Sequence, residues 1–191
     1  MVNLIDILKS LSLDATIPAE DHQLIMSMLE KVRVRKGQII VRQGTVVDSI
    51  YYIEKGLIRQ YYIKEDGKEI TEHFGQTGEY FTAAESLVLK TPSMFESVAL
   101  ENTVLLRIRK EDLETLGDRY LVIEHEYRIM LHFALVLTQL RMRSIQFETA
   151  LQRYQDLKKN KPYVIQRASS VHIASYLGIT AETLSRIKSM Q

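Results

Sequence analysis

The glycines of this 191-residue sequence are concentrated in one stretch, because six of the eight fall between residues 37 and 78. Short runs rich in β-branched and aromatic residues lie between them, at residues 38–42, 49–54 and 57–63. Short strands separated by frequent glycine turns are typical of an all-β barrel or sandwich. Asp66-Gly67 is a clear hairpin turn, because both residue types tolerate the positive φ of a two-residue loop.

Helical patterns flank this β region on both sides. Before it, residues 19–31 carry apolar side chains at helical spacing. After a last strand expected at residues 103–108, helices are expected at residues 110–116, 120–146 and 149–159. The last of these ends at a basic break containing Pro162, and residues 163–166 are expected to form a brief strand.

The helix expected at residues 120–146 carries two apolar stripes. One has the alternating four- and three-residue steps of a coiled-coil seam and comprises Ile123, Tyr127, Met130, Ala134 and Leu137. The other comprises Leu131, Leu135 and Met142. We interpret the first stripe as a dimer contact and the second as the face that packs on the helix's own barrel. The alternative is an amphipathic helix that packs on its own barrel only.

Residues 169–188 predict two short helices joined by a tight turn. Ile173 and Leu177 lie before Gly178, and Leu184 and Ile187 lie after it, at the spacing of buried helical faces. Gly178 permits the positive φ that a sharp turn between helices needs. Thr180 is a favourable N-cap for the second helix.

The second helix of this pair has a polar outward face made of Glu182, Ser185, Arg186 and Ser189. A helix that enters the major groove of DNA needs such donors and acceptors to reach base edges. The alternative is an ordinary helical hairpin whose polar face is solvated.

Charge and composition further limit the classes of function that the chain can have. Residues 146–191 hold 7 Lys and Arg against 3 Asp and Glu, whereas residues 1–145 hold 18 against 21. A basic C-terminal region favours attraction to phosphate. The absence of cysteine excludes disulfides, thiolate zinc sites and cysteine nucleophiles. The sequence has no membrane-length apolar run and no secretion signal at its N-terminus, so we expect a cytoplasmic protein without membrane contact.

Nothing in the sequence indicates catalysis. His125 and His132 are seven residues apart, which is too far for the i, i+4 pair of a helical zinc site. We also find no Ser/His/Asp signature and no phosphate-binding glycine loop. We therefore expect no enzyme activity, no metal and no cofactor.

The order of these parts resembles the Crp/Fnr family of bacterial transcription regulators over essentially the whole chain. The similarity lies in residues 36–44, 52–58, 78–81, 104–113 and 173–187. It implies an α+β fold with an N-terminal double-stranded β-helix (a β-roll or jelly roll) that acts as a sensor domain at residues 1–118. A long dimerisation helix at residues 119–146 and a C-terminal winged helix–turn–helix at residues 147–191 complete the implied architecture.

The resemblance also implies which residues contact DNA. In this family the second helix of the motif reads the major groove through a Glu-x-x-x-Arg pair, which corresponds to Glu182 and Arg186. Arginine can donate two hydrogen bonds to guanine, and glutamate can accept one from cytosine. The further implied contacts are Thr180, Thr183, Ser185 and Lys188. Ala181 replaces a second arginine of many relatives, so their operator sequence does not transfer to this chain.

The implied effector pocket departs from the family's pattern. Members that bind cyclic AMP hold its ribose with a glutamate and its phosphate with an Arg-Ser pair, and these positions are Ala83, Ser93 and Met94 here. Without a guanidinium the phosphate loses its bidentate partner, so we expect neither cyclic AMP nor cyclic GMP as effector. The remaining pocket is expected to take a less charged ligand and to be lined by Phe81, Ala83, Ser86, Ser93, Met94, Ala134 and Leu135.

The sequence therefore predicts a homodimeric, sequence-specific regulator that binds double-stranded DNA at a roughly two-fold-symmetric operator. RNA polymerase and an unidentified small-molecule effector are further candidate partners. Two alternatives stay open. One is a small-ligand sensor that acts through protein contacts, with weak or lost DNA binding. The other is a regulator whose β-roll is only a dimer scaffold.

Overall fold

The computed structural model describes residues 17–189, so the N-terminal segment in which we found no secretion signal lies outside the described residues. The expected α+β class is confirmed. Two four-stranded antiparallel sheets have the strand orders β1-β8-β3-β6 and β2-β7-β4-β5. The strands are β1 (Leu29–Val34), β2 (Ile39–Val41), β3 (Ser49–Lys55), β4 (Leu57–Ile63), β5 (Glu69–Gln76), β6 (Tyr80–Phe81), β7 (Glu96–Ala99) and β8 (Thr103–Arg109).

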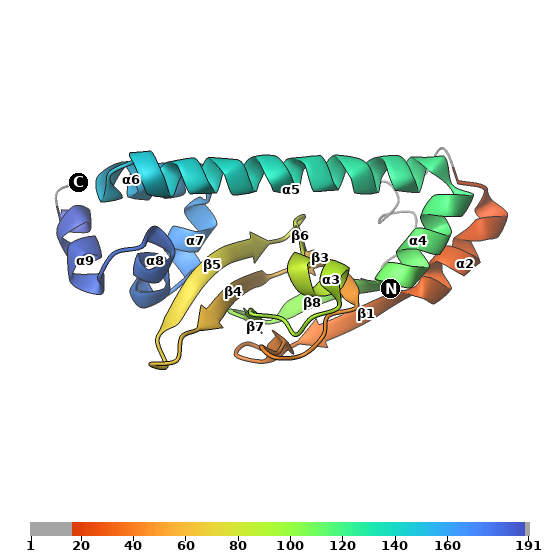
Figure 1. The fold of residues 1–191 in the computed structure, drawn as a ribbon, viewed down its shortest axis with the longest axis horizontal. Coiled ribbons are helices and arrows are strands. Elements are labelled where there is room, and N and C mark those ends of the chain that lie inside the picture. The colour runs from red at the N-terminus through yellow and green to blue at the C-terminus, as the bar shows by residue number, and fades with distance from the viewer. Residues whose placement is uncertain (1–16, 190–191) are drawn as a thin grey trace.

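The two sheets pack around one apolar cluster, and together they form the roll (Figure 1). Ile53 and Leu105 from one sheet and Ile58 and Ala99 from the other are completely buried in this cluster. Ile53 lies opposite Leu105 in the β3–β8 register, and Ile58 lies opposite Ala99 in the β4–β7 register. The strand register therefore pairs buried apolar residues within each sheet.

Gly56 joins β3 to β4, at the point where the chain passes from one sheet to the other. Its φ is +127°, and a Cβ atom there would lie 2.4 Å from Oγ1 of Thr103. A side chain would therefore be both strained and in collision with the start of β8. This is why the turn needs a glycine.

The other regular elements of the described chain are helices. They are a 3-10 turn η1 (Ala19–Asp21), α2 (His22–Met28), α3 (Ala84–Leu89), α4 (Lys110–Arg119), α5 (Leu121–Phe147), α6 (Ala150–Asn160), α7 (Pro162–Arg167), α8 (Ser170–Leu177) and α9 (Ala181–Ser189). None of the helices within residues 17–189 has both the length and the apolar character needed to cross a membrane.

The first helix is shorter than the sequence predicted. Helical spacing favoured a helix over residues 19–31, but α2 ends at Met28 and β1 begins at the next residue. β1 pairs with β8 from Leu29 to Val34. Pairing with a buried strand outweighs the local helical pattern at these positions.

The C-terminal region differs from the prediction in two ways. The strand expected at residues 163–166 is helix α7, in which Pro162 occupies the first turn and Val164 is completely buried. Proline suits the first turn of a helix because its missing N–H would be unpaired there anyway. The described residues after Arg109 contain no strand, so they contain no wing and the predicted winged form is wrong for this part of the chain.

α5 runs the length of the molecule above the sheets (Figure 1). At its N-terminal end Ile123 packs against Leu116 and Tyr120, so this residue of the predicted dimer seam is buried within its own chain. From residue 131 to residue 140 every residue is exposed. The stripe of Leu131, Leu135 and Met142 was predicted to pack on the barrel, but these side chains are 48%, 57% and 56% exposed, and that prediction is wrong.

Candidate nucleic-acid interface

The predicted pair of short helices is confirmed as α8 and α9. Ser169 caps α8, and its hydroxyl accepts a hydrogen bond from the His172 amide at 3.2 Å. Gly178 ends α8 with a φ of +69°. The Thr180 hydroxyl then accepts the Thr183 amide at 3.1 Å and starts α9. Local capping chemistry therefore fixes both ends of the turn.

The inner faces of α8 and α9 are buried as their helical spacing predicted. Ile173, Leu177 and Leu184 are at most 2% exposed, and Ile187 is 7% exposed. Burial of these faces leaves the opposite side of α9 to solvent.

The residues predicted to contact DNA lie on α9 or at its start. Glu182, Ser185, Arg186 and Lys188 are exposed. Thr180 is exposed and Thr183 is half-buried, and their hydroxyl oxygens are 3.0 Å apart. These two hydroxyls therefore serve the cap of α9 as well as its surface.

Lys188 reaches from α9 to the beginning of α8. Its Nζ donates a hydrogen bond to Oγ of Ser170 at 3.1 Å. The ammonium group thus lies beside the N-terminus of α8, where backbone amides and the helix dipole favour an anion such as a phosphate. Arg186 is exposed on the face that α9 turns to solvent.

The core beneath α8 and α9 includes a residue from the roll, Phe74 of β5. Phe74 is completely buried in the same apolar cluster as Tyr154 and Leu157 of α6. Its ring centroid lies 5.4 Å from that of Tyr176 on α8. Sequence reasoning missed this contact, because nothing local in β5 shows that its outer face packs on a helix some hundred residues later in the chain.

Ionisable groups surround the place where Phe74 of β5 packs on α6 and α8. Nζ of Lys161 donates to the Phe74 carbonyl at 3.0 Å and lies 3.7 Å from a carboxylate oxygen of Glu79. Burial, together with the nearby charges of Lys161 and Arg141, lowers the pKa of His73 to about 3. Burial also lowers the pKa of Lys161. His73 is therefore neutral at physiological pH.

The residues predicted to line an effector pocket are not all brought together. Phe81 and Ala83 lie in the roll core. The Ser86 hydroxyl accepts the Val47 amide and donates to the Thr91 carbonyl, and the Ser93 hydroxyl is bonded to the backbone of Phe95. The other three residues are exposed to solvent, and they are Met94, Ala134 and Leu135.

An open hollow of about 340 Å³ lies on the roll, at a place the sequence did not indicate. Its lining includes the buried side chains of Val41, Val47 and Tyr51 and the charged side chains of Arg42 and Arg107. Arg107 is already paired with Asp48 and Glu30. In the described part of the chain, no group of three or more histidine or acidic side chains is arranged to hold a metal ion.

Comparisons with known proteins match most of the chain. The cyclic nucleotide-binding domain family matches residues 31–120. The transcriptional regulatory protein btr of Bordetella pertussis is 23% identical over 183 residues, which cover 90% of this chain and 75% of the relative.

Solved structures share the fold. FixK2 from Bradyrhizobium japonicum is 21% identical with a TM-score of 0.70, over 85% of this chain and 83% of its own. A protein from Eubacterium rectale, described as a transcriptional regulator of the Crp/Fnr family, is 16% identical with a TM-score of 0.73, over 95% of this chain and 87% of its own.

Proposed function

The resemblance of this chain to the Crp/Fnr family is confirmed by these comparisons, and from that premise we propose that it is a homodimeric transcription regulator that binds DNA sequence-specifically. Residues 1–118 act as the sensor part, residues 119–146 as the dimerisation helix and residues 147–191 as the DNA-binding part. RNA polymerase and a small-molecule effector are the further partners in this proposal.

The observation that carries the proposal is the solvent-exposed polar face of α9. Its exposed side chains include a carboxylate at Glu182 and a guanidinium at Arg186, one helical turn apart. These groups match the donor and acceptor patterns of base edges in the major groove. Lys188, beside the α8 N-terminus, supplies a phosphate contact that sets the position of the helix on the duplex.

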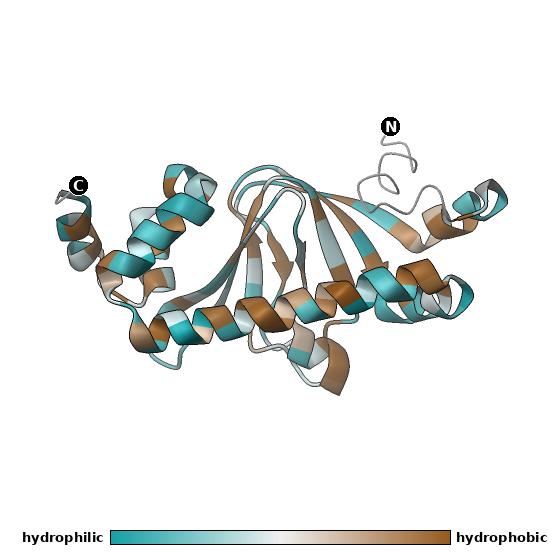
Figure 2. Cartoon of the chain, turned by 90° about the horizontal axis from the view of Figure 1, so that it is seen from above, coloured by the Kyte–Doolittle hydropathy of each residue, from teal (hydrophilic) through white to brown (hydrophobic). Residues whose placement is uncertain are grey.

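Dimerisation is supported by the surface of α5. Apolar side chains are exposed along much of this helix, and Figure 2 shows apolar (brown) bands alternating with polar (teal) ones along its length. The exposed side chains are 44–78% accessible and comprise Leu131, Phe133, Leu135, Val136, Leu137, Leu140, Met142, Ile145 and Phe147. Monomeric proteins rarely expose contiguous apolar patches larger than a few hundred Å². A second copy of α5 would cover this surface as the helices of a coiled coil do.

Three exposed polar residues in the apolar part of α5 share one stripe. His132, Gln139 and Arg143 recur at steps of seven and four residues and are all exposed. This stripe would face solvent in a dimer. Tyr127, Met130, Ala134 and Leu137 remain the proposed centre of the seam, whereas Ile123 is occupied within its own chain.

We do not assign cyclic AMP as the effector. The hydroxyl of Ser93 is engaged with the Phe95 backbone, Met94 is a thioether, and Ala83 is packed in the roll core. A cyclic phosphate placed there would be desolvated without a charged partner. Isothermal calorimetry with cyclic AMP is expected to give no saturable heat at micromolar ligand, and saturable binding in that range would contradict this assignment.

Binding to duplex DNA at graded salt concentrations separates the proposal from a sensor that acts through protein contacts. A DNA-binding dimer is expected to lose affinity steeply as salt rises, with a slope of about −0.9 for each phosphate contacted. Fluorescence anisotropy with a labelled duplex measures this slope. No binding at low salt would favour the protein-contact alternative.

A further inference from the structure

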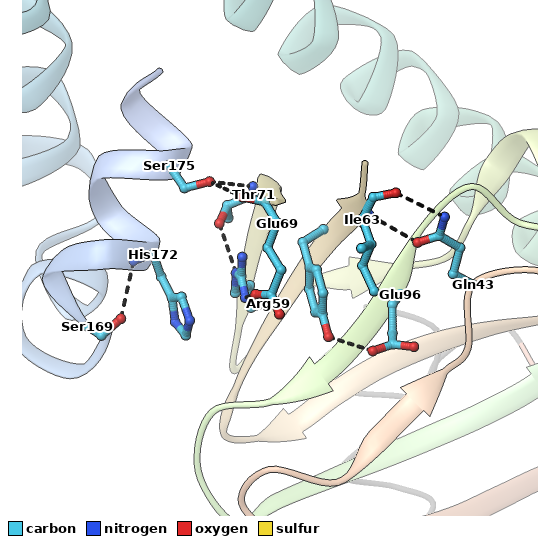
Figure 3. Close-up of polar contacts among 10 residues, drawn as sticks. Gln43, Arg59, Ile63, Glu69, Thr71, Glu96, Ser169, His172 and Ser175 are labelled. Carbon is cyan, nitrogen blue, oxygen red and sulfur yellow. Dashed lines mark hydrogen bonds and ion pairs between the residues drawn. The ribbon is translucent and has the colours of Figure 1, made fainter. Parts of the chain in front are cut away.

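The edge strand β5 is hydrogen-bonded to α8 through the side chain of one serine, Ser175. β5 is the last strand of its sheet, so its outer side has no neighbouring strand within that sheet. Oγ of Ser175 accepts a hydrogen bond from the Thr71 amide at 2.9 Å and donates one to the Glu69 carbonyl at 3.0 Å (Figure 3). The hydroxyl thus takes the place of a neighbouring strand at two backbone groups.

A second contact joins α8 to α5. The Arg141 guanidinium of α5 donates to the Tyr176 carbonyl and lies 4.0 Å from the centroid of the Tyr176 ring. That ring packs on Phe74 of β5. α8 is therefore held between the edge of the roll and the C-terminal half of α5, through neighbouring residues of one helix.

A buried charge lies beneath this contact. Arg59 of β4 is 2% exposed. Its guanidinium donates hydrogen bonds to the Thr71 hydroxyl at 2.8 Å and to the Glu69 carboxylate at 2.5 Å. His172 of α8 projects toward this group (Figure 3). Burial, followed by the nearby charge of Arg59, lowers the pKa of His172. A neutral imidazole at physiological pH avoids repulsion between α8 and Arg59.

The contact between Ser175 and β5 leaves the polar face of α9 exposed. Glu182, Ser185, Arg186 and Lys188 are all exposed while Ser175 is bonded to β5. The contact therefore does not block α9 from DNA. The two copies of α9 in a dimer must lie roughly 34 Å apart to read two half-sites, so the position of each relative to the rest of its chain matters for binding.

We propose that β5 and α8 form a latch that fixes the position of the helix–turn–helix relative to the roll, with Ser175 as its positioning residue. The inference rests on the proposed DNA-binding function. Through the latch the roll contacts α8 directly, without α5 as an intermediate. It sets the spacing of the two recognition helices in the dimer and so restricts the operators that both can reach together.

The test compares the full-length protein with Ser175→Ala, which removes both hydrogen bonds, and Ser175→Thr, which keeps the hydroxyl. Ser27→Ala is the matched control, because the Ser27 hydroxyl is exposed and bonds only within α2, to the Leu24 carbonyl. The first readout is hydrogen exchange of the Thr71 amide, which needs no DNA. The second is affinity for a selected duplex and for derivatives with the half-site spacing changed by one base pair.

Loss of two neutral hydrogen bonds is expected to speed Thr71 exchange on the order of tenfold in Ser175→Ala. Ser175→Thr and Ser27→Ala are expected to match the unmutated protein. Ser175→Ala is also expected to reduce the discrimination between correct and altered spacing, because α8 loses its two hydrogen bonds to β5 and keeps only the contacts of Phe74 and Arg141.

Unchanged Thr71 exchange in Ser175→Ala would overturn the latch, whatever the DNA results. Faster exchange with an unaltered spacing preference would also overturn it, because the contact would then have no positioning role. If the unmutated protein binds no duplex, the proposed function fails, and Thr71 exchange still shows separately whether Ser175 holds β5 and α8 together.

Discussion

Arg186 and Lys188 lie two positions apart on α9 and are expected to contribute to DNA binding in different ways. Arg186 is exposed on the solvent face, where it can reach base edges, and Lys188 lies against Ser170 at the start of α8. Arg186→Ala is expected to cost about 1–3 kcal/mol on the preferred site and to remove discrimination at one base pair. Lys188→Ala is expected to weaken binding to all sequences and to reduce the salt slope by about one unit.

Anisotropy titrations over a panel of single-base variants measure both effects. If Arg186→Ala leaves the affinity and the base preference intact, α9 is not the recognition helix.

His73 makes the stability of the fold depend on pH. Its pKa is lowered from 6.5 to about 3 by burial and by Lys161 and Arg141, so the folded protein holds it neutral. As the pH falls below 6.5, the unfolded chain gains a proton that the folded chain does not. The free energy of unfolding is therefore expected to fall by up to about 1.4 kcal/mol per pH unit from this residue, continuing toward the folded pKa.

Urea unfolding at about pH 7 and about pH 5.5 measures this dependence. His73→Gln should reduce it, whereas His132→Gln, at an exposed position of α5, should leave it unchanged. An equal dependence in all three proteins would mean that His73 is not the group responsible.

At the scale of elements, α5 is the dimer contact in this account. Ala134→Glu places a charge in the centre of the proposed seam and is expected to shift the protein toward monomer and to lower operator affinity. Gln139→Glu adds the same charge on the polar stripe and is expected to leave the dimer intact. Light scattering at micromolar concentration reports the mass of each protein, and a monomer for the unmutated chain would contradict the assignment.

Most elements follow from local patterns in the sequence. The glycine turns predict the strands of the roll, and helical spacing predicts the buried faces of α8 and α9, because these signals arise from neighbouring residues. The start of β1 could not be predicted in this way, since Leu29 joins a strand only through pairing with β8, some eighty residues later.

The remaining differences come partly from a local signal and partly from contacts distant in sequence. Residues 163–166 have strand-like composition, but Pro162 begins a helix there and Val164 fills the core below α8 and α9. The contribution of Phe74 to that core, and the bond from Ser175 to β5, depend on how two parts of the chain dock. The sequence pattern within the roll or within the C-terminal helices does not reveal how these two parts dock.

At the scale of the whole molecule, three features of the described chain bear on the proposed function. The polar face of α9 is free, the middle of α5 is apolar and uncovered, and β5 joins the roll to the helices that carry α9. A two-fold dimer through α5 would present two copies of α9 to one duplex, which is the geometry of a reader of two-fold-symmetric sites.

Selection of bound sequences from a random pool of duplex DNA tests this account most directly. The account predicts enrichment of a roughly two-fold-symmetric sequence whose half-sites lie about one helical turn apart, near 34 Å between centres. The same selection with Arg186→Ala should lose the preference at the symmetric pair of positions that Arg186 reads. No enrichment by the unmutated protein, or an enriched sequence without two-fold symmetry, would contradict the central claim.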